Sequence, residues 1–361
     1  MNAYFAKIKR KDWNDWRWQL AHRIRTTEEL SKIIDLTPKE IEDIKKVSQK
    51  FRWAISPYYA SLMDPKDKNC PIRKQAIPSI QELEDKIGVD DPKKEEKSLP
   101  VSCLFQIYPD RLVLYLTNCC PSFCRHCFRR RRIGKEDFPT PKKEIDKAIS
   151  YLQTAKEIRD VLVTGGDAFM VEDEMIEYVL KNLRKIPHIE IIRFGTRTLC
   201  TLPQRITPQL GKIISKYHPI WVNTQFNHPK EVTPEAARAC DILLSFGIPI
   251  GNQTVLLKGI NDDVSVMTEL MHKLLKIRVR PYYIFHCHFV KGVTHFRTPL
   301  WRGTEIIRKM QGFTTGFAVP RYVVSTRIGK IPLDPNYVIK KGKKEWVLVN
   351  YEGKKIKIPC Q

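Results

Sequence analysis

Three cysteines stand close together in residues 120–127, which read CPSFCRHC. Cys120, Cys124 and Cys127 form a CxxxCxxC run after an apolar stretch that begins at Arg111. A structural zinc site closes with four ligands, and a cubane iron–sulfur cluster also usually takes four cysteines. Three thiolates in one loop after a strand therefore favour a 4Fe–4S cluster whose fourth iron stays open for another ligand. The simpler alternatives are a partial zinc site and a chance grouping of cysteines.

Two further motifs follow. Residues 164–167 read TGGD, in which Gly165 and Gly166 allow close approach of the backbone to a ligand and Asp167 adds an acceptor at a strand end. Such a turn is common, but because it comes one β/α unit after the cysteines, we expect it to line the same site. Lys330 lies beside a glycine in RIGKIP, and by composition alone it is an ordinary surface lysine.

Composition limits the class of protein. A chain of 361 residues can form one large α/β domain with an extension. Ten cysteines, three of them clustered, favour metal binding over disulfides. The first residues are charged and aromatic, without a signal-peptide core, and no segment approaches a membrane span. We therefore expect a cytoplasmic protein with no membrane partner.

The chain is strongly basic. Its net charge of +23 comes from 63 Lys and Arg against 40 Asp and Glu, a balance that permits nucleic-acid binding. The basic residues are spread along the chain, however, and the dense run at 129–132 adjoins the cysteines. We expect that run to serve anionic ligands near the cluster, and we expect no nucleic-acid partner. A basic, metal-stabilised nucleic-acid-binding protein is the alternative.

The elements that would position these motifs alternate along the chain. Short β-branched runs separated by helical stretches predict a parallel sheet with right-handed crossovers. We expect an α/β fold with a partial (β/α)6 barrel at residues 101–338 and a site at the C-terminal ends of its strands. Residues 1–62 are predicted to be a helical region, 63–100 an extended surface linker and 339–361 a tail with a weak hairpin pattern. The predicted strands are Leu112–Leu116, Val161–Thr164, Ile189–Phe194, Ile220–Asn223, Ile248–Gln253 and Val279–Phe285.

From Trp13 to Tyr351 the sequence resembles lysine 2,3-aminomutases, which are radical S-adenosylmethionine (SAM) enzymes that also use pyridoxal phosphate. Stretches that carry the resemblance include YPDRLVLYLTNCCPSFCRHCFRRRR, DVLVTGGDA, NTQFNHP, IGNQTVLLKGIND and RVRPYYIF. The resemblance implies an isomerase that moves an α-amino group to C3 to give a β-amino acid. It also implies a 4Fe–4S cluster, SAM, pyridoxal phosphate, an electron donor such as ferredoxin or flavodoxin, and a homo-oligomer. A radical SAM enzyme of another reaction class, with no use for Lys330, is the alternative.

The resemblance also assigns roles to matching positions. Cys120, Cys124 and Cys127 match the cluster ligands, whereas Cys119 breaks their spacing. Lys330 matches the lysine that holds pyridoxal phosphate, through a glycine-rich loop two residues shorter than in the family. The remaining matches are Tyr108 and Arg111 for pyridoxal phosphate, Gly165, Gly166, Asp167 and Gln253 for SAM, and Arg129, whose guanidinium suits the substrate α-carboxylate.

The substrate pocket departs from the lysine-specific enzymes, which hold the distant ammonium of lysine with two aspartates. Those positions here are His288 and Ser325, and neither carries a fixed negative charge. A buried ammonium without partners is costly. The segment is more similar to glutamate 2,3-aminomutases, which have a lysine and a neutral amide there. We expect glutamate or another non-cationic substrate, with protonated His288 and nearby Lys291 holding a carboxylate; lysine held by other residues is the alternative.

Two other departures concern metal and cofactor contacts. The lysine enzymes close a zinc site with a C-terminal cysteine cluster, but here Cys240 matches one ligand and the tail offers only Cys360. This argues against zinc and against the oligomeric contact that zinc supports. Ile107 and Gln225 replace a basic residue and a histidine of the family, so cofactor contacts there must be made differently.

Overall fold

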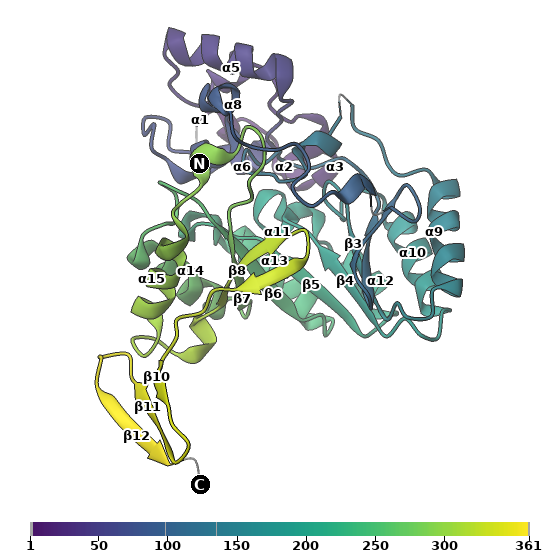
Figure 1. Ribbon diagram of the computed structural model, residues 1–361. Helices are drawn as coiled ribbons and strands as arrows, with labels where there is room; N and C mark the ends of the chain where they lie inside the picture. The colour runs from purple at the N-terminus through teal and green to yellow at the C-terminus, as the bar shows by residue number, and fades with distance from the viewer. Residues whose placement is uncertain (1–2, 98, 135, 360–361) are drawn as a thin grey trace.

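A nine-stranded, curved sheet forms the centre of the molecule (Figure 1). The computed structural model describes residues 3–97, 99–134 and 136–359. The strands lie side by side in sequence order, with β2 to β8 parallel and the outer strands β1 and β9 antiparallel to their neighbours. The strands are β1 (Leu104–Tyr108), β2 (Arg111–Tyr115), β3 (Asp160–Thr164), β4 (Ile191–Gly195), β5 (Ile220–Thr224), β6 (Ile250–Leu256), β7 (Arg280–His286), β8 (Arg321–Thr326) and β9 (Gly329–Pro332).

Helices connect the parallel strands and pack on the outside of the sheet (Figure 1). They are α9 (Lys142–Thr154), α10 (Asp173–Arg184), α11 (Thr198–Thr201), α12 (Pro208–Ser215), α13 (Pro234–Ser245), α14 (Val264–Lys276) and α15 (Leu300–Met310). The predicted α/β class, the partial barrel and all six predicted strands are confirmed. The strands β1, β8 and β9, which extend the sheet at its two edges, and the helices α11 and α15 were not predicted from the sequence.

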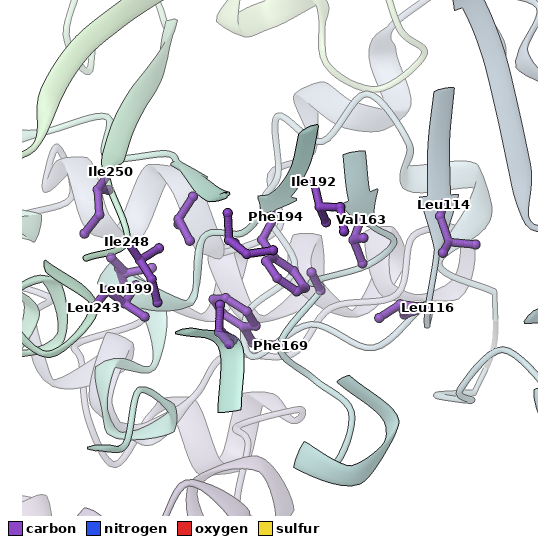
Figure 2. Packing of buried hydrophobic residues seen from close by; sticks show 14 of the residues in the cluster. Leu114, Leu116, Val163, Phe169, Ile192, Phe194, Leu199, Leu243, Ile248 and Ile250 are labelled. Carbon is purple, nitrogen blue, oxygen red and sulfur yellow. The ribbon is translucent and has the colours of Figure 1, made fainter. Parts of the chain in front are cut away.

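The apolar core lies between the sheet and these helices (Figure 2). Alternate strand residues such as Leu114, Val163 and Phe194 are fully buried in it. Residues between them in sequence, such as Leu162 and Arg193, line a cavity instead. Because side chains alternate across a strand, the same strands supply both the core and the interior of the barrel.

The N-terminal region is helical, as predicted, and it packs against the cysteine loop. Thr26 and Thr37 each form the expected capping box. The backbone N–H of Phe123 donates to the carbonyl of Ala54, 3.0 Å away, which ties the loop to this region. The helices are α1 (Ala3–Ala6), α2 (Arg10–Asn14), α3 (Trp16–Ala21), α4 (Thr27–Leu30), α5 (Pro38–Lys50) and α6 (Pro57–Ser61).

Residues 63–100 are not the extended surface linker that their prolines and charges predicted. They contain the helices α7 (Pro71–Ala76) and α8 (Gln81–Glu84) and the 3-10 turn η1 (Glu95–Lys97). Glu82 and Glu95 are fully buried and pair with arginines that lie within and directly after the cysteine run. These ion pairs hold the segment against the cysteine loop. Its carboxylates are therefore buried as partners of arginines, whereas a surface linker would leave them in solvent.

The C-terminal tail forms a three-stranded antiparallel sheet that projects from the barrel (Figure 1). Its strands are β10 (Val338–Lys341), β11 (Glu345–Val349) and β12 (Lys355–Pro359). The expected hairpin was thus one strand short. None of the described helices has the length and apolarity to cross a membrane.

Candidate active site

A cavity of about 300 Å³ runs from the C-terminal ends of the barrel strands into the barrel, and it brings the predicted site residues together. They come from the outer strand β1, from the barrel strands β2, β6 and β8, from the loops that follow β2, β3 and β7, and from β9. The predicted residues that line it are Tyr108, Arg111, Cys120, Cys124, Cys127, Arg129, Gly165, Gly166, Asp167, Gln253, His288, Ser325 and Lys330.

The three spaced cysteines face this cavity, whereas Cys119 packs in the apolar core. Burial and the nearby thiols raise the pKa of Cys120 well above its ordinary value and that of Cys127 to about 11. Bound iron would offset this cost, because a coordinating thiol is deprotonated. Among the described residues, no three His, Cys, Asp or Glu side chains are placed to hold a single ion. A cubane cluster needs no such site, since each cysteine ligates a different iron.

His126, between the second and third cysteines, adds to the fit for a bound group. Its Nε2 lies 3.0 Å from the amide nitrogen of Gln225 and 3.2 Å from that of Asn227. Its Nδ1 is buried without a hydrogen-bond partner among the described residues. Burial lowers the pKa of His126 well below its ordinary value, so the ring is neutral. The donor set and this orphaned atom both suit a cluster with a further ligand.

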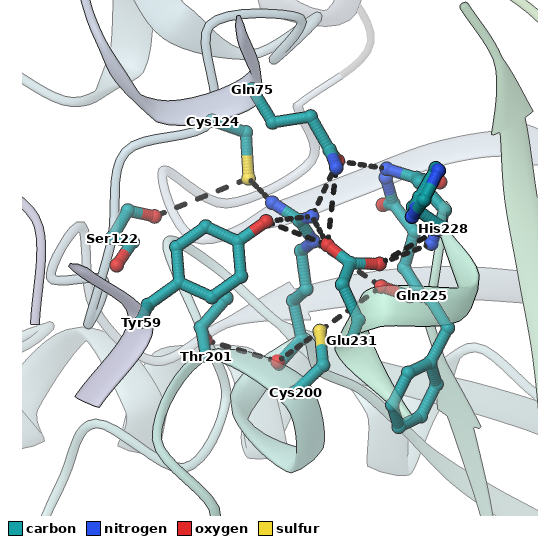
Figure 3. Close-up of polar contacts among 12 residues, drawn as sticks. Tyr59, Gln75, Ser122, Cys124, Cys200, Thr201, Gln225, His228 and Glu231 are labelled. Carbon is teal, nitrogen blue, oxygen red and sulfur yellow. Dashed lines mark hydrogen bonds and ion pairs between the residues drawn. The ribbon is translucent and has the colours of Figure 1, made fainter. Parts of the chain in front are cut away.

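A buried hydrogen-bond network fixes Cys124 (Figure 3). Arg197, which follows β4, donates from Nη1 to the Sγ of Cys124 at 2.8 Å. Its Nη2 donates to Tyr59, Gln75 and Glu231 at distances of 3.0, 2.6 and 2.5 Å. Hydrogen bonds to ligating sulfur tune the potential of iron–sulfur clusters. Arg197 was not predicted from the sequence, where it is one arginine among many.

The two glycines after β3 approach the backbone of the chain itself. A Cβ on Gly165 would lie 2.3 Å from the carbonyl oxygen of Thr117, and one on Gly166 would lie 2.3 Å from that of Cys119. The backbone N–H groups of Gly166 and Asp167 donate to those same carbonyls at 2.6 and 2.8 Å. The TGGD turn therefore holds the start of the cysteine loop, and a side chain there would displace it.

Lys330 lies where the two edges of the sheet meet. Its backbone N–H donates to the hydroxyl of Tyr108 on β1 at 2.9 Å, and Arg111 stacks 3.7 Å over the Tyr108 ring. Ser325 on β8 pairs with Lys330 across the β8–β9 hairpin. Burial, with Arg193 and Arg111 nearby, lowers the pKa of Lys330 to about 8. A substantial fraction of this amine is therefore neutral near pH 8 and able to act as a nucleophile.

Elsewhere in the lining of the cavity, three nitrogen-containing side chains pack against the ring of Phe128. The guanidinium of Arg129 lies 4.4 Å from the ring centroid, the ammonium of Lys93 4.6 Å, and the ring of His288 4.5 Å. Arg129 also donates from Nε to Glu95 at 3.0 Å. Lys93 was not predicted from the sequence, because it stands in a run of charges that is typical of a solvated segment.

Two expectations about positive charge need correction. Burial, with Lys93 and Arg129 nearby, lowers the pKa of His288 well below its ordinary value, so this imidazole is neutral at pH 7. Lys291 does not line the cavity; its backbone packs against Gly88 instead. Of the basic run at 129–132, Arg130 and Arg131 pair with carboxylates of residues 63–100. Arg129 is the member of the run that faces the cavity.

Basic side chains outnumber acidic ones in the lining of the cavity, although its four arginines pair with carboxylates that lie outside the lining. Among the described residues that line it, Asp167 is the one acid. Both of its carboxylate oxygens are engaged, since they accept from the hydroxyl of Thr196 and from the backbone N–H groups of Arg197 and Phe169, at 2.7, 2.7 and 3.1 Å. The lysines and arginines that line the cavity are Lys93, Arg111, Arg129, Arg193, Arg197 and Lys330.

Two cysteines were compared with the zinc ligands of the lysine enzymes, and two further positions replace cofactor contacts of the family. Cys240 is fully buried in α13, within the core of the barrel, and Cys360 lies outside the described residues. Ile107 on β1 and Gln225 after β5 both line the cavity.

Comparison with known proteins gives a consistent result. The Radical SAM superfamily matches residues 114–271, and the Lysine-2,3-aminomutase family matches residues 307–358. L-lysine 2,3-aminomutase of Clostridium subterminale is 51% identical over 352 residues, which cover 97% of this chain and 85% of that protein. L-lysine 2,3-aminomutase of Fusobacterium nucleatum is 49% identical over 353 residues, covering 97% and 83%. Glutamate 2,3-aminomutase of Clostridioides difficile is 50% identical over 350 residues, covering 96% and 83%.

Proposed function

Because this chain belongs to the lysine 2,3-aminomutase family of radical SAM enzymes, we propose that it is a pyridoxal-phosphate-dependent 2,3-aminomutase for amino acids with anionic side chains, glutamate first. Membership makes it a radical SAM aminomutase, an isomerase, with a 4Fe–4S cluster and SAM. The use of pyridoxal phosphate and the choice of substrate are our proposals. They rest on Lys330 and on the charges that line the cavity.

Different residues of the chain bind the cluster, pyridoxal phosphate and the substrate in this proposal. When bound, the cluster with SAM supplies a carbon radical that removes a hydrogen atom, and pyridoxal phosphate supplies a conjugated ring that supports the migration of nitrogen. Cys120, Cys124 and Cys127 hold the cluster at the mouth of the barrel. Lys330 provides a partly neutral amine where the two edges of the sheet meet. Arg129 binds the substrate α-carboxylate through its guanidinium, and the apolar walls of the cavity exclude water.

The observation that carries the choice of substrate is the imbalance of charge in the cavity. Among the described residues that line it, the one acid, Asp167, already accepts three hydrogen bonds. The four arginines of the lining have carboxylate partners outside it, whereas Lys93 and Lys330 have none within ion-pair distance in the described parts of the chain. Burying the ammonium of lysine there without a counter-charge would cost on the order of 3–5 kcal/mol. An anionic side chain gains from the same field. Lysine is the second candidate because relatives of 51% and 49% identity are L-lysine 2,3-aminomutases.

We expect the paired change His288→Asp with Ser325→Asp to shift preference toward lysine. It adds two carboxylates to the cavity at the positions where lysine-specific relatives keep aspartates. The ratio of kcat/KM for L-lysine to that for L-glutamate should rise by about 100-fold or more, since truncating or repelling a buried charge is worth ~2–5 kcal/mol. Steady-state assays of both β-amino acid products under anaerobic conditions measure this ratio.

The matched control is His272→Asp with Ser245→Asp, which adds the same two charges at exposed positions on α14 and α13. The control should leave the ratio within about threefold of wild type, in keeping with the small effects of surface charges. A paired cavity variant whose ratio matches that of the control would refute the charge argument.

A further inference from the structure

Lys93 stands at the part of the cavity where a substrate side chain would end. Its ammonium and the ring of His288 lie against the same Phe128 ring, 4.6 and 4.5 Å from its centroid. His288 occupies a position at which lysine-specific relatives hold the distant end of their substrate. A group on Lys93 is therefore beside that end. The guanidinium of Arg129, to which the proposed function assigns the α-carboxylate, lies 4.4 Å from the centroid of the same ring.

The ammonium of Lys93 has no carboxylate partner within ion-pair distance in the described parts of the chain. The nearest candidates in its own segment are engaged elsewhere, because Glu95 pairs with Arg129 and Arg131, and Asp91 pairs with Arg131. Burial and the charge of Arg129 lower the pKa of Lys93 to about 7, so the unpaired charge is costly. An anionic ligand beside this amine would stabilise its charged form and supply the partner that the chain does not.

We propose that Lys93 binds the side-chain carboxylate of the substrate and thereby determines the preference for an anionic amino acid, a role that rests on the proposed function. It supplies the positive charge that neutral His288 cannot supply. Pyridoxal phosphate does not compete for Lys93 in this arrangement, because Arg111 and Arg193 lie with Lys330 and can serve its phosphate. Lys93 is thus a specificity residue for the far end of the substrate.

The test compares L-glutamate with L-glutamine, which has the same shape but a neutral side chain. Lys93→Met removes the ammonium while keeping an apolar chain against Phe128. It should lower kcat/KM for glutamate by about 100-fold, mainly through KM, and change that for glutamine by less than about threefold. Lys93→Arg, which keeps the charge, should retain glutamate activity within about tenfold. Lys97→Met, at an exposed position of the same segment, should match wild type.

Binding provides a readout without turnover. Titration calorimetry of the cofactor-loaded enzyme without reductant should show a Kd for glutamate about 100-fold weaker in Lys93→Met, with little change for glutamine. Parallel losses for both amino acids, or no loss for glutamate, would overturn the role of Lys93 while leaving the proposed function intact. A wild-type enzyme that neither binds nor isomerises glutamate would overturn the proposed substrate class and this role together.

The pH profile separates a charged contact from a structural one. The charged and titratable groups around Lys93 come from several segments. Arg129, His288 and Lys330 belong to other parts of the chain, and Asp91 and Glu95 belong to the segment that contains Lys93. Despite their burial, Arg129 and Glu95 stabilise each other's charge, which raises the pKa of Arg129 and lowers that of Glu95, so both stay charged between pH 6 and 9. His288 stays neutral, and Lys330 affects every substrate alike. The ratio of kcat/KM for glutamate to that for glutamine should therefore fall as the pH rises through about 7. A pH-independent ratio would refute the contact.

Discussion

Replacing any one of Cys120, Cys124 or Cys127 by alanine should abolish assembly of the cluster and all aminomutase activity. Each thiolate would hold a different iron, so losing one leaves the cubane with two protein ligands. Cys124 has the strongest structural support, because Arg197 fixes its sulfur from a buried network. Iron and sulfide content after anaerobic reconstitution, together with the absorbance of the cluster, measure the loss directly.

Cys119→Ala is the matched control, because it removes a thiol from the adjacent position without touching the cavity. Cys119 packs in the core, so its loss should cost about 1 kcal/mol of stability and leave iron content unchanged. Iron loss in Cys119→Ala as severe as in Cys120→Ala would show that the ligands are assigned to the wrong cysteines.

Lys330→Ala should abolish covalent binding of pyridoxal phosphate and with it activity. The neutral amine is the nucleophile, and the lowered pKa of Lys330, about 8, makes that form available. The rate at which pyridoxal phosphate is attached to the apoenzyme should therefore rise with pH to about 8 and then level off. Borohydride reduction followed by peptide mapping identifies the modified lysine.

Lys93 is the matched control for this experiment, since among the described residues it is the other lysine that lines the cavity and its pKa is also lowered by burial. Lys93→Met should keep the covalent label on Lys330. A label found on Lys93, or on any other lysine of the wild-type enzyme, would remove Lys330 from its assigned role.

The barrel could be predicted because its strands carry a local signal. Runs such as Val161–Thr164 are apolar and β-branched, and they recur between amphipathic helices, so the order of elements alone indicates a parallel sheet. The outer strand β1 was missed. Its five residues join β2 through only Pro109 and Asp110, so the two strands are not separated by a clear loop. The residues predicted for the site stand in compact motifs with a family resemblance, and the fold brings them to one cavity.

Residues 63–100 could not be predicted from their composition, because their charges are satisfied by distant partners. Glu82 pairs with Arg125 and Arg130, more than forty residues further along the chain, and local sequence does not reveal such pairs. Lys93 lies in the same segment and was therefore not predicted as a site residue. The protonation state of His288 could likewise not be predicted from the sequence. It depends on burial and on Lys93 and Arg129, which only the fold brings close to this imidazole.

The most direct test of the proposed function is the kcat/KM of the wild-type enzyme for L-glutamate against that for L-lysine, measured anaerobically with a strong reductant. The positive cavity, in which Asp167 is the one acid among the described residues, predicts that glutamate is preferred by about 100-fold or more. Efficient turnover of lysine with none of glutamate would contradict the proposal.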